Sequence, residues 1–393
     1  MAMRWYSLDC HADTNAIIIR PKKAPMKRIG TISYNIYCNF TNYGSALQTW
    51  ALHQAIKKLG YTPVLVDYCP DILADKNPLN PFGNMWDKDE ESRRMVELTM
   101  PAIRENYRKF DRFYHERFTR TAKKYTSSNF NDVVSDEKLD GFVCGSDTIF
   151  CLDEFGFDDG YYANYACMKK NSVSYAASFG DPHFTDDSYA ILNDRIQNFN
   201  ALGIRENKMV SYLKVHTTVP VQQVIDPTLL LSAEEYAPIT GSCNESEKYL
   251  LLYARRYSPQ MEAFADHLAR ENRWRIIDIS LRAINAERGH KMAYEASVEE
   301  FLSLVKHAEY VVTNSFHGMI FAVQFCRPFV IFSREQCNSK IDEILRLFGL
   351  EDRKLITGEE ELSEIDYECV HGRIKAARKQ SFDFLKTELA IFA

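Results

Sequence analysis

The chain has 393 residues, 46% of them hydrophobic, and this length predicts two domains because a single core rarely grows so large. The formal net charge of −6 gives no reason to expect a nucleic-acid partner, so any basic site must be local. The ten cysteines form no CxxC pair and show no metal-ligand spacing, which favours a reducing cytoplasm over a disulfide scaffold and predicts no bound metal. No apolar run approaches the ~20 residues that cross a bilayer.

Short apolar strands followed by helices recur in the first half of the chain. Residues 29–33 predict a strand, residues 45–59 place apolar side chains at helical spacing, and residues 63–68 predict the next strand. This order predicts a parallel sheet with a right-handed crossover. A helical insertion at about residues 70–130 interrupts the pattern. Further strands are predicted at residues 141–144, 172–176 and 202–205.

The alternation returns after a polar linker at residues 242–247. Ser297 and Glu300 form an S-x-x-E capping box, which predicts the start of a helix. Strands are predicted at residues 249–253, 274–279, 310–312 and 329–332, and a last helix at residues 373–389. This layout predicts an α/β protein in which two Rossmann-like domains face each other across a cleft.

The predicted domain organisation has four parts. Residues 1–25 lack a signal-peptide core and are expected to be a flexible N-terminal extension. Residues 26–241 form the N-terminal domain and residues 248–366 the C-terminal domain. Residues 367–393 form a C-terminal helix that is expected to pack back on the N-terminal domain.

The strand at residues 310–312 leads into a polar turn that contains His317, and an apolar helix follows. The unpaired N–H groups and partial positive charge of a helix N-terminus attract anions. Asn314 and Ser315 can add hydrogen bonds, Gly318 permits close approach, and His317 can bind a phosphate or deliver a proton. In the alternative interpretation, Ser315 merely caps the helix and His317 hydrogen-bonds a backbone carbonyl.

Two basic residues elsewhere favour the anion site. Arg205 ends a predicted strand, where it suits bidentate binding of a carboxylate or phosphate, and Glu206 beside it can orient it. The alternative is an ordinary surface Arg–Glu pair. Lys340 begins a predicted helix, where a lysine opposes the helix dipole. Ligand binding is one explanation for this lysine, and chance exposure is the other.

Ordered sequence blocks between about Met26 and Leu350 resemble the polysaccharide pyruvyl transferase family. The resemblance rests on the order and spacing of the blocks rather than on any one of them. The blocks are NYGSALQTWALHQAI (42–56), FVCGSD (142–147), SVSYAASFG (172–180), LGIRE (202–206), VIDPTLLL (224–231) and VTNSFHGMIFAVQFCRPFVIF (312–332).

The resemblance implies a GT-B-like fold and transfer of the pyruvyl group of phosphoenolpyruvate to two hydroxyls of a sugar in a surface or capsular polysaccharide. The products are a pyruvate ketal and phosphate. Phosphoenolpyruvate is then a co-substrate, and the chemistry requires neither a metal nor another cofactor. The N-terminal domain is expected on the acceptor side and the C-terminal domain on the donor side. The acceptor sugar stays open, and so does its form: lipid-diphosphate-linked, nucleotide-linked or polymeric.

The resemblance maps the donor-binding cations of the family onto Arg205 in LGIRE, His317 in NSFHG and Lys340 in SKID. It implies that His317 is a general acid or phosphate ligand and that Arg205 clamps an anionic group. Asp147, at a strand end in CGSD, is the first choice for a catalytic base, and a turn or N-cap role is its alternative.

Five further positions belong to this picture. Asn42, Tyr43 and Gly44 precede the first helix and are candidates for contact with the acceptor, with capping of that helix by Ser45 as the competing interpretation. Ser178 ends a strand and is a fourth candidate. Asp226 is expected to be structural because the proline after it fixes a turn.

Asn314, Ser315 and Gly318 would complete the donor site, but the chain departs from the family at two points. Many members have Arg-Leu-His where this chain has Ser-Phe-His, so one donor-binding cation is absent. The stretch before Lys340 is also longer than in members where the lysine follows its strand closely, which makes Arg334 a rival. Two other functions stay open: a nucleotide-sugar glycosyltransferase and a non-catalytic glycan-binding protein of the same fold.

Residues 103–124 hold eight Lys or Arg against three acids, with aromatic residues at helical spacing. This pattern favours an amphipathic helix with its aromatic stripe in a core and a solvated charged face. The alternative is a surface that contacts anionic lipids. We therefore expect a cytoplasmic protein, with peripheral contact at the cytoplasmic face of the inner membrane as the alternative.

Overall fold

The computed structural model describes residues 26–33, 41–79, 90–181, 183–333, 338–358 and 360–393. The predicted flexible extension at residues 1–25 and the rival cation Arg334 lie outside the described residues.

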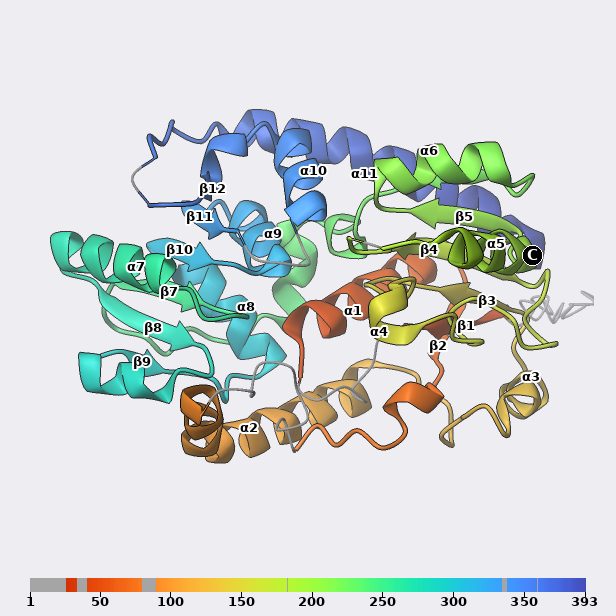
Figure 1. Ribbon diagram of the computed structural model, residues 1–393, viewed down its shortest axis with the longest axis horizontal. Helices are drawn as coiled ribbons and strands as arrows, with labels where there is room; N and C mark the ends of the chain where they lie inside the picture. Colours follow the sequence, from red (N-terminus) through yellow and green to blue (C-terminus); the bar gives the residue numbers. More distant parts are fainter. Residues whose placement is uncertain (1–25, 34–40, 80–89, 182, 334–337, 359) are drawn as a thin grey trace, which may run out of the picture.

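A parallel sheet forms the centre of the N-terminal domain (Figure 1). Within the described residues it has six strands in the order β2-β1-β3-β4-β5-β6. These strands are apolar, and all but the edge strand β6 are buried, because helices cover both faces of a parallel sheet. The strands are β1 (Arg28–Ile32), β2 (Thr62–Leu65), β3 (Gly141–Cys144), β4 (Ser172–Ala177), β5 (Ala201–Ile204) and β6 (Val221–Gln223). The helices are α1 (Tyr43–Lys58), α3 (Val133–Glu137), α4 (Leu152–Phe155), α5 (Asp186–Arg195) and α6 (Asn207–His216).

The C-terminal domain repeats this design, and its described strands follow the order β12-β11-β10-β7-β8-β9, again parallel. The strands are β7 (Tyr249–Tyr253), β8 (Arg275–Ile279), β9 (Lys291–Met292), β10 (Tyr310–Thr313), β11 (Phe329–Phe332) and β12 (Lys354–Leu355). The helices are α7 (Pro259–Asn272), α8 (Val298–His307), α9 (Phe316–Gln324) and α10 (Asn338–Phe348). The predicted capping box opens α8, where the Ser297 hydroxyl accepts from the Glu300 N–H. Two Rossmann-like domains of GT-B-like arrangement are therefore confirmed.

Each sheet reverses its strand order at one point, and these points position the site. In the N-terminal sheet β1 lies between β2 and β3, and in the C-terminal sheet β7 lies between β8 and β10. Loops that leave neighbouring strands at such a point diverge, which opens a crevice beyond the carboxyl ends of the strands. The loop after β3 contains Asp147, and the turn after β10 contains His317. The two crevices face each other.

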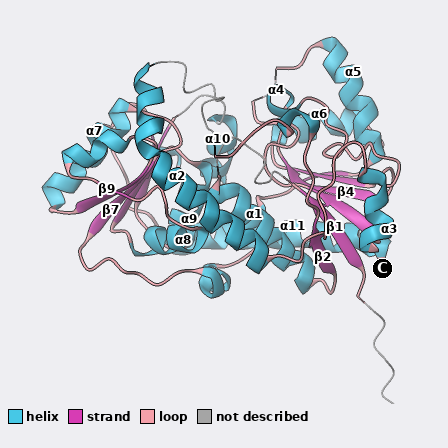
Figure 2. Cartoon of the chain, turned by 90° about the horizontal axis from the view of Figure 1, so that it is seen from below, coloured by secondary structure: helices cyan, strands magenta, loops and turns pink. Residues whose placement is uncertain are grey.

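Two long helices join the domains (Figure 2). Helix α2 (Glu90–Arg117) comes from the insertion, and its Lys109 forms an ion pair of 2.7 Å with Glu300 on α8. Most of the aromatic stripe predicted on this segment is buried in a core shared with α1 and α8, and Tyr107 is half-buried. The buried aromatic residues of the stripe are Phe110, Phe113, Tyr114 and Phe118.

Helix α11 (Tyr367–Leu389) is the second connection. It begins six residues before the predicted start at residue 373, because the Asp366 side chain caps it by accepting from the Cys369 N–H at 3.0 Å. Val370 in its first turn is buried in a cluster with residues of the C-terminal domain. Phe384 near its end is buried against the N-terminal sheet. The helix therefore spans both domains.

A buried histidine on α1 makes stability sensitive to acid. His53 is 1% exposed, and its Nε2 lies 2.6 Å from the hydroxyl of Thr31 on β1. Burial, with a contribution from Lys57, lowers the pKa of His53 to about 3. The unfolded chain therefore binds more protons than the folded protein between the ordinary pKa near 6.5 and about 3.

We expect the free energy of unfolding to fall by up to about 1.4 kcal/mol per pH unit as the pH drops below 6.5. Replacement His53→Gln keeps an acceptor for Thr31 and removes the titration, so it should flatten this part of the profile. Urea unfolding at pH 7.5 and pH 5 measures the effect. An equal loss of stability in both proteins would contradict the role of His53.

Candidate active site

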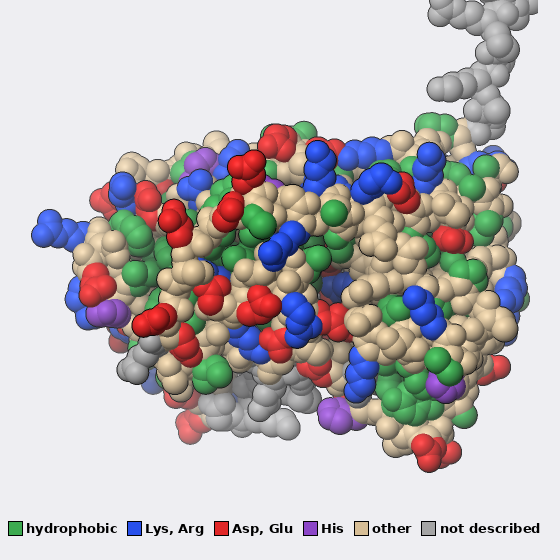
Figure 3. All heavy atoms as spheres, turned by 90° about the horizontal axis from the view of Figure 1, so that it is seen from above, with side chains coloured by type: hydrophobic (Ala, Val, Ile, Leu, Met, Phe, Trp, Pro, Cys, Tyr) green, Lys and Arg blue, Asp and Glu red, His purple; other side chains and the backbone are tan. Residues whose placement is uncertain are grey.

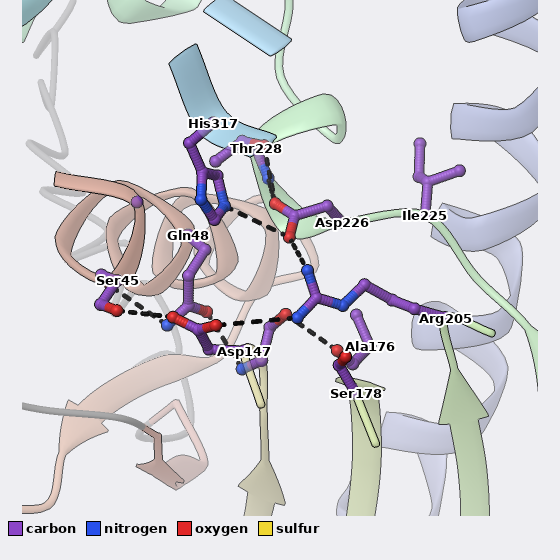
Figure 4. A network of polar contacts seen from close by, with 12 residues as sticks. Ser45, Gln48, Asp147, Ala176, Ser178, Arg205, Ile225, Asp226, Thr228 and His317 are labelled. Carbon is purple, nitrogen blue, oxygen red and sulfur yellow. Dashed lines mark hydrogen bonds and ion pairs between the residues drawn. The ribbon is translucent and has the colours of Figure 1, made fainter. Parts of the chain in front are cut away.

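The facing crevices bring four charged side chains into one network (Figure 4). Asp147 follows β3, Arg205 follows β5, Asp226 lies in the loop after β6, and His317 lies in the first turn of α9. All four are buried to at least nine-tenths, with exposures between 1% and 7%. The sequence analysis selected three of them for catalysis and treated Asp226 as structural.

Arg205 extends from the end of β5 between two carboxylates. Its Nη1 donates to Asp226 at 2.6 Å, and its Nη2 lies 3.9 Å from Asp147. The Nε and Nη2 groups are buried without a hydrogen-bond partner among the described residues. The predicted partner Glu206 turns away, because it accepts hydrogen bonds from the Ser178 hydroxyl and the Phe179 N–H. Arg205 therefore keeps unused donors that an anionic ligand can fill.

Asp226 was expected to have only a structural role, and in the structure it also contacts Arg205 and His317. Its Oδ1 accepts from the N–H of Thr228 at 2.9 Å and from the Thr228 hydroxyl at 2.6 Å, which is the expected turn role. Its Oδ2 faces both Arg205 and His317. Burial opposes its ionisation, but His317 and Arg205 outweigh burial and hold the pKa of Asp226 well below its usual value. The turn thus fixes the carboxylate that orients both cations.

His317 lies against the start of α1. Its Nε2 is 3.5 Å from Asp226 Oδ2, a contact that becomes an ion pair when the imidazole is protonated. Its other nitrogen packs on Gly44, where an added Cβ would lie only 1.9 Å from Nδ1. Gly44 was predicted to contact the acceptor, and the structure shows that its missing side chain makes room for the imidazole.

Asp147 closes the network on the side of the N-terminal domain. Its backbone is left-handed, with φ of 72°, and its Oδ2 accepts from the Ser45 hydroxyl at 2.5 Å. Burial raises the pKa of this carboxyl, but Arg205, Lys340 and His317 together bring it below its usual value. A carboxylate of low pKa stays charged but is a weak base.

Lys340 enters from α10 of the C-terminal domain and is 9% exposed. Its Nζ lies 5.6 Å from the ring centroid of Phe316, and the guanidinium carbon of Arg205 lies at the same distance from that ring. No hydrogen bond joins its ammonium group to a side chain in the described ranges. Both cations therefore lie near the ring of Phe316, although they belong to different domains.

These cations line an open cleft of about 560 Å³ between the domains. It is bordered by α6, the loop after β6, α10 and α11, and Arg205, Asp226, Phe316 and Lys340 lie on its wall. The space-filling view from the side of α6, α10 and α11 shows the surface hollowed here, with acidic and basic side chains around the opening (Figure 3). Its volume falls within the ~300–1,000 Å³ of ordinary ligand pockets.

Several predicted contact residues also have partners within the protein. Asn42 caps α1 by accepting from the Gly44 N–H at 2.9 Å. Tyr43 stacks on Phe301 of the C-terminal domain with ring centroids 4.4 Å apart. Ser178 is fully buried and donates to Glu206. The side chains of these three predicted acceptor residues are therefore held by contacts within the protein.

Hydrogen bonds also hold the turn between β10 and α9 in place. Asn314 ties the loop after β7, because it accepts from the Arg255 N–H at 2.7 Å and donates to the Arg256 carbonyl at 2.8 Å. Ser315 caps α9 by accepting from the Gly318 N–H at 3.2 Å. An added Cβ on Gly318 would lie 2.7 Å from the Thr313 hydroxyl, so this glycine serves close packing of α9 on β10. The turn therefore holds His317 rigidly.

The described residues form neither a metal-ligand cluster nor a membrane-spanning helix. They contain no group of three or more His, Cys, Asp or Glu side chains arranged to hold a metal ion. None of the helices in them has the length and apolar character that a membrane crossing needs.

Fold and site together define a two-domain α/β protein with a cationic pocket built from both domains. The family model of the polysaccharide pyruvyl transferases matches residues 42–336, so the chain belongs to the polysaccharide pyruvyl transferase family. Membership of this family implies a transferase that adds pyruvyl groups to polysaccharide. A search of curated protein sequences gives no significant match.

Solved structures with similar overall arrangements are distant in sequence. The chain is similar to the UDP-GlcNAc 2-epimerase from Neisseria meningitidis bound to UDP-GlcNAc, with TM-score 0.48, 10% identity, and coverage of 93% of this chain and 100% of that chain. It is similar to a putative UDP-N-acetylglucosamine 2-epimerase from Listeria monocytogenes, with TM-score 0.48, 10% identity, and coverage of 93% and 91%. It is also similar to the glycosyltransferase SnogD from Streptomyces nogalater, with TM-score 0.43, 10% identity, and coverage of 94% and 100%.

Proposed function

We propose that the protein transfers the pyruvyl group of phosphoenolpyruvate to two hydroxyls of one sugar in a surface or capsular polysaccharide repeat unit. The observation that carries this proposal is the pair of buried cations in the cleft. Arg205 has Nε and Nη2 donors with no hydrogen-bond partner among the described residues, and Lys340 lies on the wall of the same cleft. Buried donors without acceptors are costly, so a ligand with negative groups fits here. Phosphoenolpyruvate brings a phosphate and a carboxylate.

The chemistry needs a proton donor and a charge clamp. His317, paired with Asp226, donates a proton to the methylene carbon of phosphoenolpyruvate, and the adjacent carbon becomes electrophilic. One sugar hydroxyl forms a bond to that carbon, the carbon–oxygen bond to phosphate breaks, and a second hydroxyl closes the ketal. Of the two hydroxyl protons, one restores His317 and the other leaves with phosphate. Arg205 and Lys340 stabilise the departing negative charge.

Asp147 is the proposed first acceptor of the hydroxyl proton that then leaves with phosphate. Its hydrogen bond from Ser45 and its charge pair with Arg205 support a position next to the reacting atoms. Because its pKa is lowered, it would act in concert with bond formation and not by prior deprotonation.

The direct test incubates the protein with phosphoenolpyruvate and a panel of nitrophenyl and lipid-diphosphate-linked sugars. Phosphate release matched by one pyruvylated product per phosphate is the expected result. Protection from heat by a nucleotide sugar, without turnover of phosphoenolpyruvate, would instead indicate a glycosyltransferase. Binding of glycans without any phosphate release would indicate a non-catalytic protein.

Replacement Lys340→Gln tests the donor pocket. The amide keeps much of the side chain's size and loses the charge, so we expect the KM for phosphoenolpyruvate to rise about tenfold, the equivalent of ~1.4 kcal/mol. The kcat should fall by a smaller factor, because Arg205 still stabilises the departing charge and His317 stays in place. Lys354→Gln is the matched control, since Lys354 lies in the same domain and pairs with Asp342 at 2.6 Å. Unchanged donor affinity in Lys340→Gln would remove Lys340 from the pocket.

A further inference from the structure

Helix α10 contacts the N-terminal domain through its first two turns. The Ser339 hydroxyl donates to Asp181, and Lys340 reaches into the cleft. One turn later, both carboxylate oxygens of Glu343 accept from the N–H of Asn207, at 3.2 and 3.1 Å. Residues three apart share a helix face, so Lys340 and Glu343 point to the same side of α10.

The contact of Glu343 lies next to Arg205. Asn207 is the first residue of α6, and a carboxylate at a helix N-terminus is favourably placed. The side-chain amide of Gln223 donates both to Glu343 at 3.4 Å and to the backbone carbonyl of Arg205 at 3.0 Å. Glu343 is thus joined to the backbone that carries the donor-binding arginine.

The position is electrostatically demanding for Glu343. Burial raises the pKa of Glu343, and the neighbouring carboxylate of Glu206 raises it further. The described residues nonetheless give it three hydrogen-bond contacts, all from the opposite domain. These hydrogen bonds connect the two domains and do not stabilise α10 itself, although the carboxylate is repelled by Glu206.

We propose that Glu343 is a positioning residue that fixes Lys340 of the C-terminal domain opposite Arg205 of the N-terminal domain. This inference rests on the proposed function, in which these two cations together bind the donor. Lys340 and Glu343 lie one turn apart on α10. If α10 shifts when the Glu343 contact is lost, Lys340 shifts together with the helix. Because the donor pocket is assembled from both domains, a small shift of α10 separates its two charges.

Three variants test the inference. Glu343→Ala removes the acceptor and should raise the KM for phosphoenolpyruvate about tenfold, with kcat changed less than about threefold. Glu343→Gln keeps an acceptor oxygen for the Asn207 N–H and should recover most of the affinity. Asp342→Asn is the matched control, because Asp342 is on the same helix but pairs with Lys354 inside the C-terminal domain. Its KM should equal that of the wild type.

Hydrogen exchange of the α6 N-terminus gives a readout without substrate. The Asn207 amide should exchange faster in Glu343→Ala and at the wild-type rate in Asp342→Asn. Unchanged exchange, or faster exchange with an unchanged KM, would overturn the positioning role. A wild-type protein that fails to turn over phosphoenolpyruvate would defeat the proposed function, while the exchange result would still report whether the contact exists.

Discussion

Replacement Asp226→Asn should lower kcat/KM for phosphoenolpyruvate about a thousandfold. The carboxylate faces Arg205 at 2.6 Å and His317 at 3.5 Å, with 1% exposure. Breaking a buried ion pair by removing one partner costs about 3–5 kcal/mol, because the remaining charge is uncompensated. If the whole cost destabilises the transition state, kcat/KM falls by roughly two to four orders of magnitude, at 1.36 kcal/mol per factor of ten.

The amide keeps an acceptor for Thr228, so the turn should form and the variant should fold with reduced stability. Steady-state phosphate release and circular dichroism together measure the effect. Asp158→Asn is the control, because Asp158 is a partly buried carboxylate that accepts a hydrogen bond from Tyr68 and lies outside the cleft. We expect the control to lose stability and keep its kcat. A folded Asp226→Asn protein with turnover within tenfold of the wild type would contradict the model of the site.

Replacement Gly44→Ala should reduce kcat nearly as far as His317→Asn, by about 10²–10⁴-fold if His317 is the general acid. The new Cβ would lie 1.9 Å from Nδ1 of His317 and 2.6 Å from its Cγ, far inside contact distance. The imidazole or the start of α1 must therefore shift, which changes the contact between His317 and Asp226. A displacement of about 1 Å is enough to lose a hundredfold in rate.

The same substitution should leave α1 intact, because alanine is favoured over glycine in a helix by about 1 kcal/mol. A thermal melt and a kcat measurement therefore separate folding from catalysis. Gly372→Ala on α11 is the matched control, since no heavy atom lies within 4 Å of its added Cβ. It should keep full activity. Equal activity of the two alanine variants would show that His317 tolerates displacement and does not transfer the proton.

The sequence predicted much of the architecture because strand and helix periods repeat along the chain. Burial on both faces makes strands such as Tyr249–Tyr253 continuous apolar runs, and the capping box at Ser297 marks a helix start. The network around His317 and Arg205 could be anticipated because both residues follow a strand of a parallel sheet. Carboxyl ends of such strands meet at one edge, so residues distant in sequence converge there.

The polar connections inside the site could not be anticipated. An aspartate before a proline carries the signal of a turn, and nothing in VIDPTLLL indicates that Oδ2 of Asp226 faces the opposite domain. The contacts of Tyr43 with Phe301 and of Asn314 with the Arg255 N–H are likewise visible only in the folded chain. Gly44 was predicted to precede the first helix, and only the folded chain shows it in the first turn of α1, where His317 occupies the place of a side chain.

The apolar core beneath the cleft belongs to neither domain alone. Leu47 on α1, Phe110 on α2 and Met319 on α9 share one buried cluster, and α11 reaches it as well through Val370. The two halves of this protein therefore cannot be exchanged between family members as independent modules. A chimaera would need to inherit the facing surfaces of α1, α2, α9 and α11 together, and we expect sequence drift at these positions to be coupled across the two halves.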